Sequence, residues 1–149
     1  MAMQVLIYGG LNFSGNIDWK RELVEALGRM IVGENMILVT GGAIGEGDGL
    51  TKGGVDFHAA RGAQLFLNDK DIEKQKIVTI LPSTDAEGCF KIGEIVCDTV
   101  KDIKDRRKKL VARVDAIITV EGGPGVLDIA EFASMCNRLF LPLGGTGGK

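Results

Sequence analysis

The chain has 149 residues, of which 45% are hydrophobic, and its formal net charge at pH 7 is −2. This length and composition predict one globular domain over residues 1–149, with enough apolar residues to bury a core. The small negative charge predicts no partner among nucleic acids or acidic membranes. No apolar run approaches the roughly 20 residues that a membrane-spanning helix needs.

The cysteines indicate a reducing compartment. Cys89, Cys97 and Cys136 are odd in number and form no CxxC pair. This pattern favours structural thiols over a disulfide framework or a zinc site. The first ten residues lack the basic segment of a signal peptide and indicate a strand instead. We therefore expect a cytoplasmic protein, and we predict neither a metal site nor a cofactor.

The first half of the chain alternates apolar runs with helical patterns. Residues 3–8 form a short apolar run that ends at two glycines, which predicts a buried strand. Residues 17–31 carry apolar side chains near helical spacing, at Trp19, Leu23, Leu27 and Met30, and predict a helix with Trp19 in the core. Residues 36–40 predict a second strand, a shorter helix is expected within residues 50–61, and residues 76–82 predict a third strand.

The second half continues the alternation after an irregular segment. Residues 83–102 are expected to be mostly loop, with room for one short helix. Residues 102–114 predict a basic helix, and residues 115–120 a fourth strand. Residues 125–136 predict a helix that places Phe132 in the core, and residues 138–143 a fifth strand.

The predicted strands are short, continuously apolar and rich in Ile, Val and Leu, and they alternate with helices. This is typical of a parallel sheet covered on both faces. With right-handed crossovers, the sequence predicts an α/β fold with a single doubly wound, Rossmann-like sheet of about five strands. Ligands of such sheets bind beyond the carboxyl ends of the strands.

Glycines gather at that edge. The chain has 22 glycines, against about ten expected from average usage, and clusters follow the first, second, fourth and fifth strands. Backbone amides without side chains, with a helix starting behind them, hold phosphate groups. We therefore expect ligand contacts from Gly9, Gly10, Gly41, Gly42, Gly45, Gly122, Gly123, Gly125 and Gly145. Asn12 and Ser14, after the first strand, are further candidates for phosphate or sugar contacts, with a simple turn as the alternative.

Two common nucleotide motifs are absent from the sequence. No GxxxxGK sequence followed by Ser or Thr is present, which argues against an ordinary ATPase or GTPase. The first strand-to-helix turn also lacks the GxGxxG spacing of dinucleotide-dependent redox enzymes.

One long segment resembles a known family. The sequence DRRKKLVARVDAIITVEGGPGVLDIAE, residues 105–131, is similar to the signature region of the LOG family and the wider SLOG superfamily. In this signature an arginine on a helix is followed by an apolar strand and a glycine loop. Arg106 matches the family's arginine, nine residues before Asp115, and Gly122, Gly123 and Gly125 match its glycines. The other basic residues of this helix, Arg107 among them, are expected on a solvated face.

The LOG resemblance implies an enzymatic function. LOG enzymes use the arginine and a glutamate to cleave the N-glycosidic bond of nucleoside 5′-monophosphates, which releases the base and ribose 5-phosphate. In this chain Glu121, Val126 and Ile129 stand where the motif has proline, threonine and glutamate. If the protein is an enzyme, the resemblance therefore implies Arg106 and Glu131 as its catalytic residues.

The end of the chain resembles a second branch of the superfamily. Residues 125–148 are similar in layout to sensor SLOG domains of Thoeris-type anti-phage systems, in which a glutamate-bearing helix, a strand and a PxGxTGG loop follow one another. The glutamate is Glu131 here, and the loop contains Gly145 and Thr146. The resemblance implies that Arg106 neutralises phosphate and that Glu131 accepts hydrogen bonds from ribose hydroxyls. It also implies a homodimer and a fused or associated effector domain.

Two functions that depend on a ligand stay open, beside a third class, a purely structural oligomerisation domain. The first, which we favour, is a sensor domain that binds a nucleotide-derived signal of the ADP-ribose or cyclic nucleotide type. The alternative is a phosphoribohydrolase. A carboxylate beside a ribose serves either function, because it can stabilise an oxocarbenium-like transition state or only bind the hydroxyls.

Overall fold

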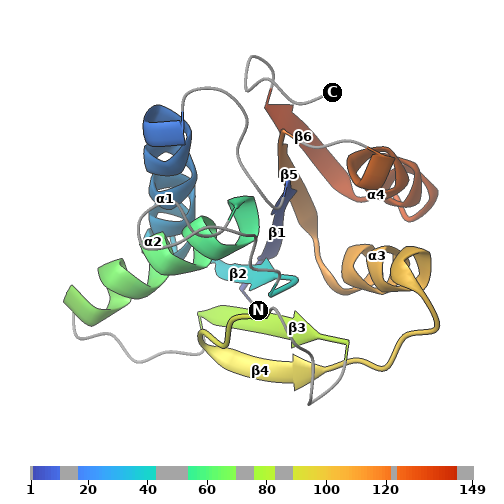
Figure 1. Ribbon diagram of the computed structural model, residues 1–149, viewed down its shortest axis with the longest axis horizontal. Coiled ribbons are helices and arrows are strands. Elements are labelled where there is room, and N and C mark those ends of the chain that lie inside the picture. Colours follow the sequence, from blue (N-terminus) through green and yellow to red (C-terminus); the bar gives the residue numbers. More distant parts are fainter. Residues whose placement is uncertain are drawn as a thin grey trace.

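The structure, a computed structural model, describes residues 2–10, 17–42, 54–69, 76–82, 89–121 and 124–143. Within these ranges six parallel strands form one sheet in the order β4-β3-β2-β1-β5-β6 (Figure 1). The strands are β1 (Gln4–Gly9), β2 (Ile37–Thr40), β3 (Ile77–Leu81), β4 (Glu94–Cys97), β5 (Ala116–Val120) and β6 (Leu139–Leu143). The helices are α1 (Ile17–Gly33), α2 (Val55–Asp69), α3 (Ile103–Arg113) and α4 (Pro124–Met135).

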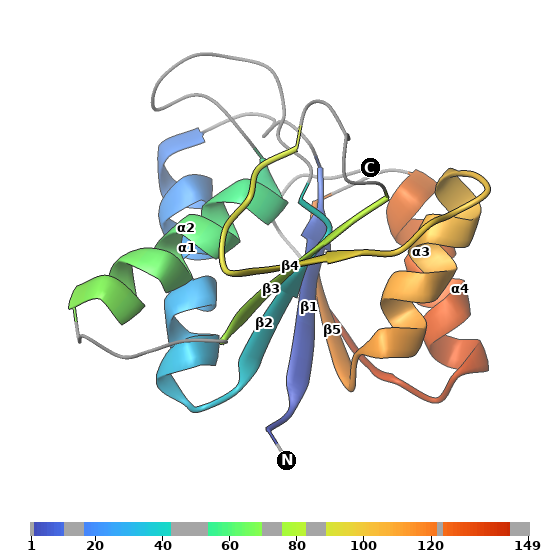
Figure 2. The ribbon, with the colours of Figure 1, turned by 90° about the horizontal axis from the view of Figure 1, so that it is seen from below.

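The sheet is doubly wound. From β1 the chain moves outward through β2, β3 and β4, and it then returns to the other side of β1 with β5 and β6. Helices α1 and α2 cover one face, and α3 and α4 cover the other (Figure 2). The strand order therefore reverses between β1 and β5, and open α/β sheets bind ligands at such a switch point. The predicted α/β class is confirmed.

The two faces of the sheet explain the continuously apolar strands. On β1, Val5 and Ile7 pack in the cluster under α1 and α2, whereas Leu6 packs in the cluster under α3 and α4. Successive residues of a strand point to opposite faces, so a strand covered on both faces needs apolar residues at most of its positions. Leu6 and Ile7 are both fully buried.

The strand β4 lies within the segment that we expected to be mostly loop. It forms one edge of the sheet, and three of its four residues are exposed. Gly93 enters it with φ of +77°, and a Cβ at this position would lie 2.3 Å from the carbonyl oxygen of Ile77. Glycine is therefore required at the point where the chain turns into this edge strand.

The contact between α1 and α2 depends on glycine. A Cβ on Gly28 would lie 1.9 Å from the carbonyl oxygen of Ala59, and one on Gly62 would lie 2.1 Å from that of Glu25. This close approach turns the side of α1 that bears Val24 and Gly28 inward. The prediction of Trp19 in the core is wrong, because its side chain is 42% exposed.

The remaining predictions about the helices hold with changes in length. Phe132 is buried in the α3/α4 cluster, as predicted. The second helix extends to Asp69, well beyond the expected end at residue 61. In the part of the chain that the structure describes, no helix is long and apolar enough to cross a membrane.

Candidate functional site

The carboxyl edge of the sheet holds only part of the predicted site within the described residues. Gly9, Gly10, Gly41, Gly42 and Arg106 lie at or over this edge, Gly125 lies in the first turn of α4, and Glu131 lies further along that helix. The other predicted contacts lie outside the described residues; these are Asn12, Ser14, Gly45, Gly122, Gly123, Gly145 and Thr146.

Arg106 reaches over the edge from α3. Its Nη2 donates to the carbonyl oxygen of Gly41, just after β2, and to that of Ile80 in β3, at 3.3 Å. Both acceptors are neutral, so these bonds orient the guanidinium without cancelling its charge. The structure thus holds one cation at the edge where the sequence predicts an anionic group.

Asp56 reaches the same edge from the opposite face of the sheet. It lies in the first turn of α2 and is only 6% exposed. Burial raises the pKa of its carboxyl to about 7, although Arg106 and the backbone amides of Gly9 and Gly41 favour the charged form. Its Oδ1 is buried and has no hydrogen-bond partner within the described ranges of the chain. Sequence reasoning did not identify this residue.

Gly41 lies between these two side chains. A Cβ at this position would lie 3.1 Å from Nη2 of Arg106 and 3.3 Å from Oδ2 of Asp56. Both contacts are tighter than most side chains tolerate, so glycine leaves the space in which a guanidinium and a carboxylate approach each other. Gly41 therefore has a role in building the site, whether or not its amide contacts a ligand.

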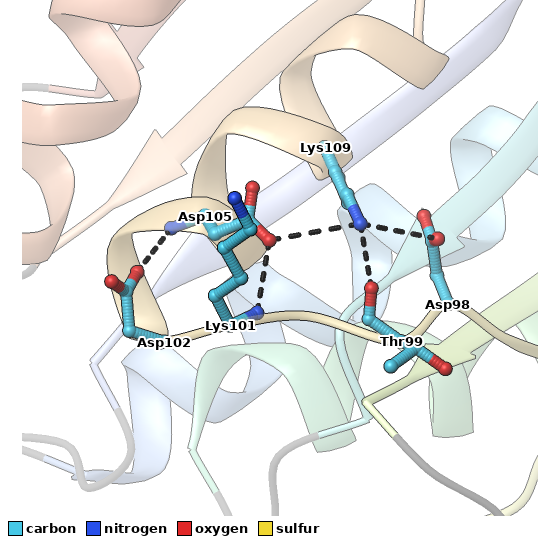
Figure 3. Close-up of polar contacts among 6 residues, drawn as sticks. All are labelled: Asp98, Thr99, Lys101, Asp102, Asp105 and Lys109. Carbon is cyan, nitrogen blue, oxygen red and sulfur yellow. Dashed lines mark hydrogen bonds and ion pairs between the residues drawn. The ribbon is translucent and has the colours of Figure 1, made fainter.

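The start of α3 is fixed by a network of polar contacts (Figure 3). The N-cap residue Asp102 accepts a hydrogen bond from the amide of Asp105 at 2.8 Å, and Asp105 accepts one from the amide of Lys101 at 3.0 Å. Lys109 Nζ donates to the carbonyl oxygen of Thr99 at 2.6 Å. Capping of this kind fixes where a helix begins, and Arg106 lies in the turn that follows.

Arg107 is not the solvated residue that we expected. Its Nε donates to the hydroxyl of Tyr8 at 3.0 Å, and its Nη1 pairs with Oδ2 of Asp128 at 3.0 Å. A Cβ on Gly125 would lie 2.8 Å from its Nη2. Burial raises the pKa of the Tyr8 hydroxyl, although Arg107 opposes this shift. Arg107 therefore links α3 to β1 and α4, near the place where the strand order reverses.

A buried ion pair joins α1 to the end of β5. Lys20 of α1 pairs with Glu121, the residue that follows β5, and their side chains are only 5% and 3% exposed. Glu121 has a φ of +56°, a left-handed conformation that non-glycine residues seldom adopt. This pair fixes the chain just before the predicted glycine turn. Lys20 gave no sequence signal, because it stands within an ordinary helical pattern.

Glu131 lies on the exposed side of α4, whereas Ile129 is fully buried in the α3/α4 cluster. The helical spacing explains this difference, since residues two apart point to opposite sides of a helix. A ligand contact by Glu131 stays a prediction. Of the residues that are described, no three His, Cys, Asp or Glu side chains gather where they could hold a metal ion.

The sheet order and the position of Arg106 and Asp56 at its carboxyl edge define a Rossmann-like α/β protein. Solved structures share this fold. The structural-genomics protein TM1055 superposes with a TM-score of 0.71 and 21% identity, over 98% of this chain and 76% of that one. The molybdenum cofactor carrier protein of Chlamydomonas reinhardtii superposes with a TM-score of 0.66 and 17% identity, over 97% of this chain and 78% of that one.

A third structure with this fold is DNA processing protein A of Helicobacter pylori, described with a single-stranded DNA binding mode. Its TM-score is 0.66 at 17% identity, over 94% of this chain and 64% of that one. At these identities the likeness establishes the fold alone. No protein-family model and no curated protein matches the chain.

Proposed function

We propose that this chain is a SLOG-type sensor or regulatory domain that binds a nucleotide-derived ligand at the carboxyl edge of its sheet. The observation that carries the proposal is the position of Arg106, whose guanidinium is held at this edge by two neutral carbonyl groups. A planar guanidinium suits phosphate, because it can donate two parallel hydrogen bonds.

The surrounding helices favour the same class of ligand. Helices α2 and α4 follow β2 and β5, so their N-termini lie toward the carboxyl edge of the sheet. The N-terminus of a helix carries a partial positive charge that stabilises anions. A ligand with a phosphate group therefore meets favourable charge from Arg106 and from the helices.

Calorimetric titration with AMP, ADP-ribose and cyclic ADP-ribose tests the proposal. Arg106→Ala is expected to weaken binding by about 1.5–3 kcal/mol, the range for hydrogen bonds to charged groups. Lys104→Ala is the matched control, because Lys104 is an exposed cation of the same helix and a solvated charge contributes little. Absence of binding at millimolar concentrations would refute the proposal. Equal losses in both variants would indicate diffuse electrostatic attraction instead of a site.

An assay for free base separates the sensor from the phosphoribohydrolase. The enzyme motif places its glutamate at the position of Ile129, which is buried in the core, and Glu131 is the nearby carboxylate that the sequence offers instead. We expect no base to be released from AMP. Release of base by the wild type, lost in Glu131→Gln while AMP still binds, would establish the enzyme instead.

The solved structures supply two competing ligands for the same titration. One belongs to a molybdenum cofactor carrier, and another is described with single-stranded DNA. A short DNA oligonucleotide is expected not to bind, because the chain carries a net charge of −2 and nucleic-acid binding depends strongly on cations. If the molybdenum cofactor bound more tightly than any nucleotide, it would replace the nucleotide as the proposed ligand, and the proposed site would stay the same.

A further inference from the structure

Asp56 is a buried carboxyl that the fold leaves incompletely satisfied. The residue is 6% exposed, and its Oδ1 is shielded from solvent without a hydrogen-bond partner among the residues that the structure describes. Leaving a buried acceptor unsatisfied destabilises a fold, and the cost is larger for a charged group. Groups of this kind are rare in folded proteins, and they gather at functional sites.

The chemistry of the Asp56 carboxyl defines the hydrogen-bond partner that it lacks. An ionised carboxylate only accepts hydrogen bonds, so the missing partner is an N–H or O–H donor. The position of Asp56 then limits where the donor comes from. Oδ2 of Asp56 and Nη2 of Arg106 both lie within 3.3 Å of one point, the place where Gly41 would carry a Cβ. A donor that reaches Asp56 therefore lies close to an anion that reaches Arg106.

We propose that Asp56 is a specificity-determining residue that accepts a hydrogen bond from a ribose hydroxyl of the ligand whose phosphate contacts Arg106. This inference rests on the proposed function and narrows it to nucleoside phosphates with free ribose hydroxyls. Asp56 belongs to α2 and Arg106 to α3, so the ligand bridges the two faces of the sheet across the ends of β1 and β2. Because the Asp56 carboxyl is buried, a charge-assisted bond to it discriminates strongly against a ligand that lacks the hydroxyl.

A double-mutant cycle between protein and ligand measures this contact. AMP and 2′,3′-dideoxy-AMP are titrated into the wild type and Asp56→Ala at pH 8, where Asp56 is mostly ionised. The wild type is expected to prefer AMP by about tenfold or more, as for a hydrogen bond to a charged group. Asp56→Ala is expected to lose most of this preference. The control is Glu22→Ala, which removes an exposed carboxylate of α1 and is expected to keep the wild-type preference.

A second variant keeps the test decisive if Asp56→Ala does not fold. Asp56→Asn preserves the shape and one acceptor oxygen but removes the charge, and its preference for AMP is expected to fall to a few-fold, the range of neutral hydrogen bonds. Equal binding of both ligands by the wild type, or an unchanged preference in the folded Asp56 variants, would overturn the role of Asp56 and leave the proposed function standing. Failure of the wild type to bind any nucleotide would overturn both.

Discussion

Replacement of Asp56 by Asn is expected to change how the stability of the fold depends on pH. Asn retains the size of the side chain and an oxygen that can accept hydrogen bonds from the amides of Gly9 and Gly41, but it cannot ionise. The comparison of the two proteins therefore isolates the cost of burying the Asp56 charge.

The sign follows from proton binding. The pKa of Asp56 is about 7 in the folded protein, raised by burial from 3.8. Between these two values the folded state binds more protons than the unfolded state, so the free energy of unfolding falls as the pH rises. The cost is absent below about pH 4 and fully present above about pH 7.

The magnitude follows from the same shift. Each pKa unit corresponds to about 1.4 kcal/mol, so the charged carboxyl destabilises the fold by about 4 kcal/mol at pH 8. Between pH 5 and pH 8 the stability of Asp56→Asn relative to wild type is expected to rise by about 3 kcal/mol. For a chain of this length, that corresponds to a relative gain in melting temperature of about 6–12 °C.

Urea unfolding of both proteins at pH 5, 6, 7 and 8 measures the difference directly, because all other titrating groups are shared and cancel. A difference in unfolding free energy that stays constant across this range would show that Asp56 does not titrate as a buried acid. A difference that falls as the pH rises would mean that the fold stabilises the charged form, and the assignment of an unsatisfied carboxyl would be wrong.

Three further substitutions test the packing around the site, each by urea unfolding. Lys20→Met leaves the buried Glu121 carboxylate without this cation and is expected to cost about 3–5 kcal/mol; a loss below 1 kcal/mol would contradict a buried pair. Gly28→Ala places a Cβ 1.9 Å from a carbonyl oxygen of α2 and is expected to destabilise by about 1–3 kcal/mol or more. Its control is Gly33→Ala, whose Cβ meets nothing closer than 3.5 Å; equal effects would show that the helices do not cross at this point. Arg107→Ala removes two hydrogen bonds that join three elements and is expected to cost about 1.5–3 kcal/mol, whereas a solvated residue would cost almost nothing.

The strands and helices that fill the core could be predicted because their pattern is local. A strand that is buried on both faces needs a run of mainly apolar residues, and β1, β3 and β5 each have one, with a single threonine in β3 and in β5. The edge strand β4 has only four residues between Gly93 and Asp98 and exposes most of them, so burial leaves little trace in its sequence. The side of α1 that faces inward was also misjudged, because Gly28 and its contact with α2 select that side, and apolar spacing alone does not reveal this contact.

The residues of the candidate site also divide into those with a local sequence signal and those without one. Arg106 was identified because it belongs to a recognisable motif with fixed spacing. Asp56 was missed because its character arises only from tertiary packing: α2 buries it, and Gly41 and Arg106 approach it from distant parts of the chain. No window of sequence around Asp56 contains these neighbours. Lys20 and Glu121 follow the same rule, since 101 positions separate the partners of this ion pair.

The glycines show why composition identified the correct edge but not the whole reason for it. Excess glycine was interpreted as backbone exposed to a ligand, yet each of Gly9, Gly41 and Gly125 also has a neighbour that a Cβ would contact closely. At Gly9 the neighbour is the carbonyl oxygen of Val120, 2.0 Å from a Cβ, and at Gly125 it is Arg107. At Gly41 the neighbours are the two ionisable groups of the candidate site. A substitution at Gly41 that abolishes binding would therefore not establish a contact between its amide and the ligand, because its Cβ would also crowd the side chains of Arg106 and Asp56. Evidence for the site must come from those two side chains.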